Sequence, residues 1–376
     1  MDQVLGVHPP APDPAPTVVV QPVRGRRLDS LTGLRWFAAF IVFGFHLSLS
    51  PEVTADSGVK NVLHTLFRSG AAGVTFFFIL SGLVLTWSAR PGDRPVAFWR
   101  RRVARVVPNH VVVWIGVLAV LAVTHRAAGA GPSISGLFLV QAWIPDQAYY
   151  FGGNTPAWSL SCEMAFYAAF PLLLPLLRKV PGRRLWMLAI GLPVAIALVP
   201  AVSLAMSSGL AYWFTWVFPV PRVLDFALGM VLGLMIQQGR WRGPNLPVAA
   251  VLVLVCYSIE PLAPERWTLV AWMVVPFAVL IAAAATADVT GRGSWLRARP
   301  LVWLGEISFA FYLVHQPVIR FGAKALGSHA SPVVGIAGAL VIGLVAVGAA
   351  AVLYRVVERP MERRLAGRRR QPTAAS

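Results

Sequence analysis

The sequence predicts an all-α fold, a polytopic integral membrane bundle of about ten transmembrane helices. The first observation is composition: 57% of the 376 residues are hydrophobic, 13% are charged, and the mean hydropathy is +0.67. A soluble domain carries about 25% charged residues. The second observation is that apolar residues form runs close to the roughly 20 residues that cross a bilayer. The predicted segments are 31–50, 71–89, 106–123, 157–177, 185–206, 221–237, 246–260, 267–287, 302–320 and 332–354.

Two segments leave the number of crossings open, at about nine to eleven. The segment 246–260 is short for a membrane helix, and the apolar run 134–144 is shorter still. Irregular backbone at membrane depth needs protein or water around it. We therefore assign 134–144 to a half-buried or interfacial segment.

The third observation is the placement of basic residues. The net charge is +18, yet the arginines gather in clusters between alternate apolar runs, which is the positive-inside pattern of membrane proteins. We therefore expect contact with membrane lipid and not with nucleic acid, and both termini on the cytoplasmic side. Three regions follow: a proline-rich, disordered cytoplasmic tail at 1–27, a membrane domain at 28–360, and a basic cytoplasmic tail at 361–376.

The sequence gives no support to metal or redox chemistry. The two cysteines, Cys162 and Cys256, both lie inside apolar segments and lack the spacing of metal ligands or of a disulfide framework. A GxSxG nucleophile elbow is also missing from the sequence. We expect no metal and no permanently bound cofactor.

The first helix carries two ionisable residues, which are functional candidates because charge inside a membrane is costly. Arg35 and His46 are eleven residues apart, so on a helix they differ by about 20° around the axis and by roughly 16 Å along it. They share one face at two depths, with Arg35 near the cytoplasmic end. The alternative is a snorkelling arginine and an ordinary buried histidine.

Two further arginines suit an anionic ligand. Arg102 and Arg105 stand one turn apart on one face, before Pro108, and paired guanidinium groups favour phosphate. A plain positive-inside anchor explains the same charge.

Polar residues on other helices complete the candidate set. Ser159 and Glu163 share a face of the fourth helix, and His46, also in the outer half, is a sensible partner for Glu163. Ser308, Tyr312 and His315 form a polar stripe on the ninth helix.

Glu306, near the inner end, could pair with an arginine, whereas we assign Asp225 to a helix-dipole interaction and leave it outside the site. The candidate substrate-binding residues are Ser81, Trp158, Ser161, Tyr312 and His315.

These residues, in this order, resemble the acyltransferase-3 family of membrane proteins. The resemblance covers about 28–360 and rests on five ordered motifs, where any one would be weak. They are the spacing of Arg35 and His46, FFFILSG at 76–82, RVARVVP at 102–108, WSLSCE at 158–163 and LGEISFAFYLVHQP at 304–317.

The resemblance implies a ten-helix enzyme of the inner (cytoplasmic) membrane, with cytoplasmic acyl-CoA as co-substrate. Its acceptor would be a hydroxyl, often on a carbohydrate or a macrolide-type natural product. It also implies that Arg35, His46, Arg102, Arg105 and Glu163 matter for activity. Some family members carry a soluble esterase-like domain behind the membrane part, so a separate periplasmic or extracellular partner enzyme is a further expectation.

Our hypothesis for the chemistry makes His46 the general base on the acceptor hydroxyl, with Glu163 orienting it. Arg35, Arg102 and Arg105 would hold the phosphates of CoA. A covalent route through Ser159, Ser161 or Cys162 ranks lower, because none lies in a nucleophile elbow.

Two other function classes stay open at this point. One is a transporter or flippase of a glycolipid or acylated metabolite, since intramembrane His, Glu and Arg also build transport pathways. The other is a non-catalytic membrane subunit that binds a partner through its basic tail.

Overall fold

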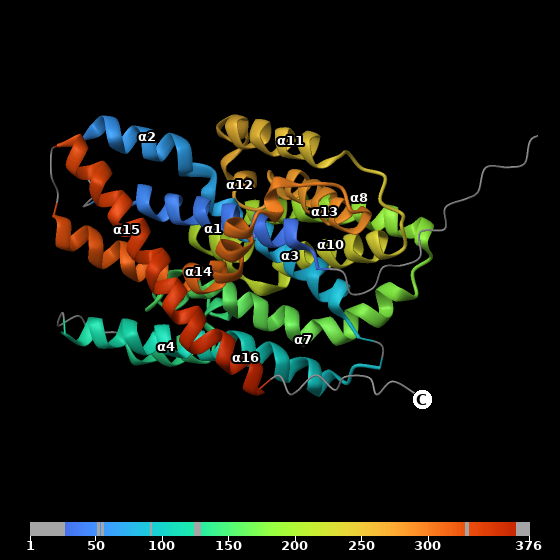
Figure 1. The fold of residues 1–376 in the computed structure, drawn as a ribbon, viewed down its shortest axis with the longest axis horizontal. Helices are drawn as coiled ribbons and strands as arrows, with labels where there is room; N and C mark the ends of the chain where they lie inside the picture. The colour runs from blue at the N-terminus through green and yellow to red at the C-terminus, as the bar shows by residue number, and fades with distance from the viewer. Residues whose placement is uncertain are drawn as a thin grey trace, which may run out of the picture.

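The computed structural model describes residues 27–50, 53, 56–90, 92–123, 129–327 and 331–365. Over these ranges the chain is almost entirely helical and has no β-strand. Most of the long helices run along one direction in a single bundle, with α3 and α10 near the middle and α4 at one side (Figure 1). Apart from Arg27, the predicted N-terminal tail lies outside the described residues, as do 366–376 of the C-terminal tail.

Sixteen α-helices are present in the described ranges, joined by short 3-10 and π segments. The α-helices are α1 (Asp29–Ser48), α2 (Ser57–Phe67), α3 (Gly73–Ser88), α4 (Pro95–Val123), α5 (Ala130–Leu137), α6 (Gln147–Tyr150), α7 (Trp158–Arg178), α8 (Gly182–Val202), α9 (Ser208–Tyr212), α10 (Pro219–Gln237), α11 (Leu246–Ile259), α12 (Glu265–Thr268), α13 (Val274–Thr290), α14 (Arg299–Leu326), α15 (Pro332–Leu353) and α16 (Arg359–Leu365). The 3-10 segments are η2 (Arg68–Ala72), η3 (Gln141–Trp143), η4 (Thr155–Ala157), η5 (Ser203–Ala205), η7 (Glu260–Leu262) and η8 (Trp295–Arg297), and the π segments are η6 (Trp213–Val217) and η9 (Tyr354–Glu358).

The membrane architecture predicted from hydropathy is confirmed, since every predicted segment is a helix. Seven described stretches are long and apolar enough to cross a bilayer: Asp29–Ser48, Ser57–Ser88, Pro95–Val123, Thr155–Arg178, Gly182–Ala205, Ser208–Gln237 and Pro332–Arg364. Two more, Leu246–Leu262 and Val274–Thr290, are shorter. The remaining predicted segment is α14, which has 28 residues and carries the polar stripe. The run 134–144 forms the end of α5 and the turn η3.

Two glycines bring α3 and α10 into backbone contact. A Cβ atom on Gly82 would overlap the carbonyl oxygen of Phe226, and one on Gly229 would overlap the carbonyl oxygen of Ile79. Small residues allow such close approach in membranes, where helix association depends on packing rather than on the hydrophobic effect. The pair therefore fixes the position of α3, one wall of the site described below.

Two prolines inside helices free backbone carbonyls that side chains then use. Proline has no N–H, so the carbonyl four residues earlier loses its helical donor. Pro171 frees the carbonyl of Tyr167, which accepts a hydrogen bond from Trp99 Nε1 at 2.9 Å. Pro317 in α14 frees the carbonyl of Leu313, which accepts one from the Nδ2 atom of Asn154 at 2.9 Å. Distant segments are thereby tied to helix kinks.

A buried carboxylate fixes the start of α1. Asp288, 3% exposed at the end of α13, accepts hydrogen bonds from the backbone N–H of Ser30 at 2.9 Å and from its hydroxyl at 2.7 Å. Arg297 donates to the same carboxylate at 2.6 Å. Acidic groups at a helix N-terminus satisfy free N–H donors and the dipole together. This contact sets the position of α1 and of the residues it carries.

The expectation for Asp225 was wrong. Asp225 lies two turns into α10 and is buried, 3.3 Å from Arg222 Nη2. Arg222 is fully buried; it donates to Thr75 Oγ1 at 2.8 Å and its guanidinium lies over the rings of Phe78 and Trp216. A local charge partner and two aromatic faces make burial of this arginine tolerable.

We predict that Gly229→Ala destabilises the bundle, because the new methyl group must push α3 away from α10. Overpacking of a tight contact costs about 1–3 kcal/mol. The check is thermal unfolding of the detergent-solubilised protein, with Gly191→Ala as the matched control, since its Cβ would meet open space in α8. Equal stability of the two variants would contradict the close contact.

We also predict that Asp288→Ala lowers stability by about 3 kcal/mol, the order expected when one partner of a buried ion pair is removed. The change leaves the first N–H groups of α1 and Arg297 without their acceptor. Thermal unfolding measures the loss, and Glu265→Ala on the exposed helix α12 is the control. A wild-type unfolding temperature for Asp288→Ala would show that the carboxylate does not hold α1.

Candidate active site

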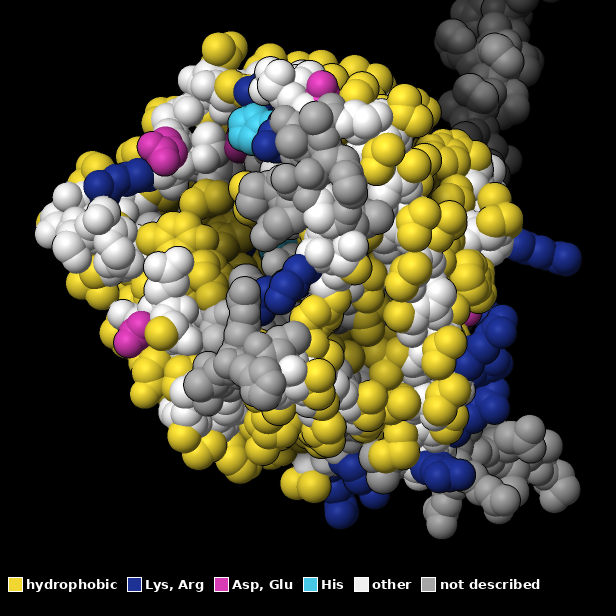
Figure 2. Space-filling model, turned by 90° about the vertical axis from the view of Figure 1, so that its left-hand side faces the viewer, with side chains coloured by type: hydrophobic (Ala, Val, Ile, Leu, Met, Phe, Trp, Pro, Cys, Tyr) yellow, Lys and Arg dark blue, Asp and Glu magenta, His cyan; other side chains and the backbone are white. Residues whose placement is uncertain are grey.

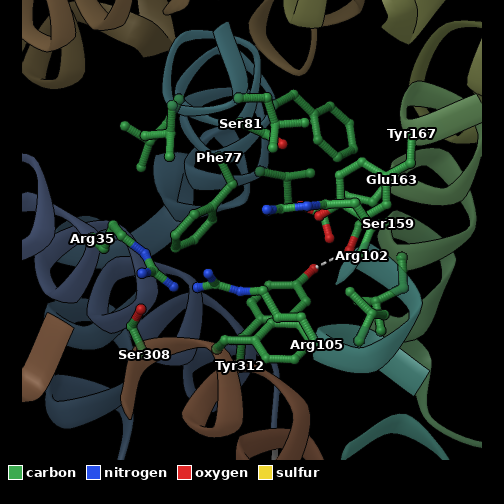
Figure 3. A pocket seen from close by; sticks show the side chains of 18 residues that line it. Arg35, Phe77, Ser81, Arg102, Arg105, Ser159, Glu163, Tyr167, Ser308 and Tyr312 are labelled. Carbon is green, nitrogen blue, oxygen red and sulfur yellow. Dashed lines mark hydrogen bonds between the residues drawn. The ribbon is translucent and has the colours of Figure 1, made fainter. Parts of the chain in front are cut away.

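A cavity with a volume of about 120 Å³ lies between α1, α3, α4, α7 and α14. Its polar lining comes from Arg35, Ser81, Arg102, Arg105, Ser159, Glu163, Tyr167, Ser308 and Tyr312, and its apolar lining from residues such as Phe77, Val84 and Phe309. Figure 3 shows the polar side chains converging on the cavity from several helices.

Three arginines reach this cavity from two helices. Arg35 enters from α1, while Arg102 and Arg105 enter from α4, and their guanidinium groups point into the space that Glu163 also faces (Figure 3). Glu163 interacts electrostatically with all three. The three arginines therefore lie together as expected, whereas Glu163, expected beside His46, lies with them instead. Three guanidinium groups and one carboxylate leave this part of the cavity with excess positive charge.

Tyr167 is a lining residue that the sequence analysis missed. It follows Glu163 by four residues, so both lie on one face of α7, and its ring stands beside the carboxylate in Figure 3. The spacing of four residues from Glu163 could have indicated Tyr167. It did not stand out, because Tyr167 is one of several aromatic residues in an apolar helix.

Two carboxylates near the C-terminus interact with Arg105, and the sequence analysis missed them as well. Glu362 in α16 lies 3.6 Å from Arg105, and Glu358, 2% exposed, accepts a hydrogen bond from Asn109 at 2.7 Å and interacts electrostatically with Arg105. The helix α16 thus takes residues 361–365 into the bundle edge, although a basic tail was expected there. The surrounding arginines drew attention away from both glutamates.

A hydroxyl pair lies in the wall of the cavity. The Ser159 and Tyr312 hydroxyls are 2.8 Å apart, drawn as the dashed line in Figure 3, and Ser159 also donates to the carbonyl of Pro156 at 2.9 Å. The Tyr312 ring lies 5.6 Å from the ring of His315. Tyr312 therefore lines the cavity and also neighbours His315, one member of a histidine pair.

The histidine pair is formed by His46 and His315, whose Nδ1 and Nε2 atoms are 3.2 Å apart. His46 Nδ1 also lies 2.9 Å from the carbonyl oxygen of Val42, and His315 Nδ1 lies 2.7 Å from that of Tyr312. A carbonyl oxygen can only accept, so each Nδ1 carries a proton, and His315 Nε2 accepts from His46. In a neutral His46 ring this leaves Nε2 unprotonated and able to take up a proton.

The expected pairing of His46 with Glu163 was wrong. Glu163 faces the arginines and Tyr167, while His315 occupies the place beside His46. The helical period gives the face that each residue occupies on its own helix, but not which neighbouring helix that face meets. The pairing expected for Glu306 is confirmed, because Arg27 Nη2 lies 3.3 Å from it.

Of the candidate substrate-binding residues, Ser81 and Tyr312 line the cavity, and the other three lie outside its lining. Trp158 is buried against Phe78 and Trp216, with ring centroids 6.4 and 5.2 Å away. Ser161 is fully buried in α7. Neither histidine lines the cavity, although the ring of Tyr312, which does, neighbours that of His315.

Comparison with known proteins gives a consistent set of relatives. The family model described as an acyltransferase domain matches residues 28–355. The chain is 42% identical to "Acyltransferase MdmB" of Streptomyces mycarofaciens over 94% of this chain and 96% of that protein. It is 30% identical to "Exopolysaccharide production protein ExoZ" of Rhizobium meliloti, over 82% and 94% of the two chains. It is 25% identical to "Peptidoglycan O-acetyltransferase OatA" of Listeria monocytogenes, over 80% of this chain and 50% of that protein. No solved structure matches.

Proposed function

Because the chain belongs to the acyltransferase-3 family and is a multi-pass membrane O-acyltransferase, we propose acyl-CoA as its donor. The acceptor in this proposal is a hydroxyl of a carbohydrate or a macrolide-type natural product, and the transferred group is short, such as acetyl. The observation that carries the donor assignment is the convergence of Arg35, Arg102 and Arg105 on one cavity with a long apolar wall.

The three arginines suit the phosphates of CoA. A planar guanidinium donates in parallel to two phosphate oxygens, and Arg102 and Arg105 one turn apart can hold neighbouring phosphate groups. Glu163 keeps the guanidinium groups oriented and partly neutralised when the cavity is empty. The apolar lining around Phe77 and Phe309 then receives the uncharged arm and the acyl group.

The hydroxyl pair is suited to the thioester carbonyl. Ser159 and Tyr312 lie in the cavity wall next to the histidine pair. Either hydroxyl can turn its proton toward a carbonyl oxygen that gains negative charge during attack. Because Tyr312 lines the cavity and its ring neighbours that of His315, the acyl group would meet the acceptor close to this ring.

His46 is the base in the proposed transfer, with His315 in the orienting role. His46 Nε2 takes the acceptor's hydroxyl proton as the oxygen bonds to the thioester carbon, and His315 Nε2 holds the His46 Nδ1 proton. The carbon–sulfur bond then breaks, and the CoA thiolate receives the proton from His46, so the ester and free CoA are the products. A thiol with a pKa of about 8.5 leaves without strong acid assistance.

The charge pattern sets the orientation in this proposal. The arginine end of the cavity faces the cytoplasm, where acyl-CoA is available, in the inner (cytoplasmic) membrane, and both termini are cytoplasmic. His46, at the last turn of α1, then lies toward the outer end. A donor from inside and an acceptor from outside would meet near Tyr312.

We predict that Arg102→Gln weakens acetyl-CoA binding by about tenfold or more, since a charge-assisted contact to phosphate is lost. Isothermal titration of the purified protein measures the dissociation constant. Arg178→Gln, at the exposed end of α7, is the control and should bind as the wild type does. Equal affinity of Arg102→Gln and Arg178→Gln for acetyl-CoA would contradict the assignment of CoA phosphates to this site. Absence of acetyl-CoA binding by the folded wild type would contradict acyl-CoA as the donor.

We predict that His46→Ala lowers the transfer rate by about 10²- to 10⁴-fold, the contribution of a positioned base, while acetyl-CoA affinity stays unchanged. The measurement is release of free CoA in the presence of acceptor, with titration of acetyl-CoA in parallel. His64→Ala on the exposed face of α2 is the matched histidine control. Transfer at the wild-type rate by His46→Ala would exclude it as the base.

A further inference from the structure

The C-terminal helix lies along α4 and brings acidic side chains to the arginines of the cavity. Figure 1 places α16 beside α4. On α4, Arg105 and Asn109 are four residues apart and share one face, and Glu358 and Glu362 are spaced in the same way on the facing segment. Arg105 contacts Glu362, and Asn109 contacts Glu358. The two segments therefore run antiparallel, with two matched contacts between them.

A wide helical turn directs the two glutamates toward α4. The helix α15 continues through the π segment η9 into α16 without a break. A π turn holds one residue more than an α turn, so the helix after it is rotated by about 100° relative to a regular continuation. Glu358 ends this turn and is 2% exposed. Single π turns of this kind are frequent at functional sites.

The two glutamates are held very differently. Glu358 is buried and accepts a hydrogen bond from Asn109 Nδ2 at 2.7 Å. Glu362 Oε1 lies 3.6 Å from Arg105 Nε, beyond ordinary hydrogen-bond length, and its side chain is 38% exposed. Exposed ion pairs contribute little to stability. Glu362 can therefore turn into water at little cost, whereas Glu358 is fixed in place.

Arg105 has more acidic neighbours than a single cation needs. Glu163, Glu358 and Glu362 all interact with it electrostatically. Figure 2 views the bundle from the left of Figure 1, and Lys and Arg side chains gather along its lower edge, at the height of α4 and α16 in Figure 1. Because Arg105 also lines the cavity, a phosphate that enters must compete with these carboxylates.

We propose that Glu362 is the exchangeable partner of Arg105, which it holds in the empty protein and releases when a donor phosphate takes its place. This inference rests on the proposed function, because it concerns the donor half of the same transfer. It makes Glu362 a positioning residue that acts through Arg105 and lowers donor affinity. The helix α16 is thereby coupled to donor binding.

The test is isothermal titration of the full-length protein in nanodiscs with acetyl-CoA at low salt. Glu362→Gln keeps the length of the side chain and removes its charge, so we expect acetyl-CoA to bind about threefold more tightly, the order of one exposed ion pair. Glu362→Ala should give the same gain. A residue with only a structural role would give a loss of affinity or no change.

A double mutant shows whether Glu362 acts through Arg105. In an Arg105→Gln background, Glu362→Gln should change the dissociation constant by less than about 1.5-fold, because the pair is already broken. The matched control is Asp93→Asn, which removes the partner of Arg101 on the same helix but outside the cavity. Its affinity for acetyl-CoA should equal that of the wild type. Thermal unfolding checks that each protein is folded.

Equal or weaker acetyl-CoA binding by folded Glu362→Gln and Glu362→Ala overturns the proposal. A gain that persists in the Arg105→Gln background also overturns it, because Glu362 would then act on the donor directly. The same gain in Asp93→Asn would assign the effect to general charge at this end of the protein and not to the pair. Failure of the folded wild type to bind acetyl-CoA is a different result, which overturns the proposed function and this inference with it.

Discussion

The cost of holding three guanidinium charges inside a membrane bundle shapes the rest of the structure. Each buried ion loses several kcal/mol of hydration unless charge and hydrogen bonds replace it. Glu163 compensates part of this lost hydration from within the cavity. Glu358 and Glu362 compensate a further part from the C-terminal segments η9 and α16. The wider cluster is therefore close to neutral, while the surface exposed to a ligand stays positive. This arrangement lets the empty protein be stable and still attract an anion.

The helices that carry these charges are positioned by backbone features. The glycine contact between Gly82 and α10 places α3 as a wall of the cavity, and Asp288 fixes where α1 starts and so where Arg35 lies. Proline kinks in α7 and α14 release carbonyls that Trp99 and Asn154 then occupy. In a bilayer every such carbonyl must find a donor. The same prolines thus also tie α4 to α7 and the loop residue Asn154 to α14.

Most of the helices could be predicted from the sequence. So could the charged residues of the cavity, but not all of their partners. Long apolar runs identify membrane helices directly, whereas the short exposed α2 has no such signal. Arg35, Arg102, Arg105 and Glu163 could be found because charges are rare in apolar segments. Tyr167 could not, because an aromatic residue is ordinary there. The partner of His46 depends on how α1 and α14 are rotated against each other, which the period of a single helix does not contain.

The Tyr312 side chain has a consequence for the membrane itself. A protein that took a donor from one side and an acceptor from the other through an open passage would let ions and protons leak. Here the hydrogen-bonded Tyr312 and Ser159 stand in the wall of the arginine-lined cavity, and the Tyr312 ring neighbours the histidine pair. In the proposed transfer from a cytoplasmic donor to an acceptor on the outer side, a bulky ring in this wall would hinder the passage of ions and protons through the protein. It would thereby help to preserve the membrane potential.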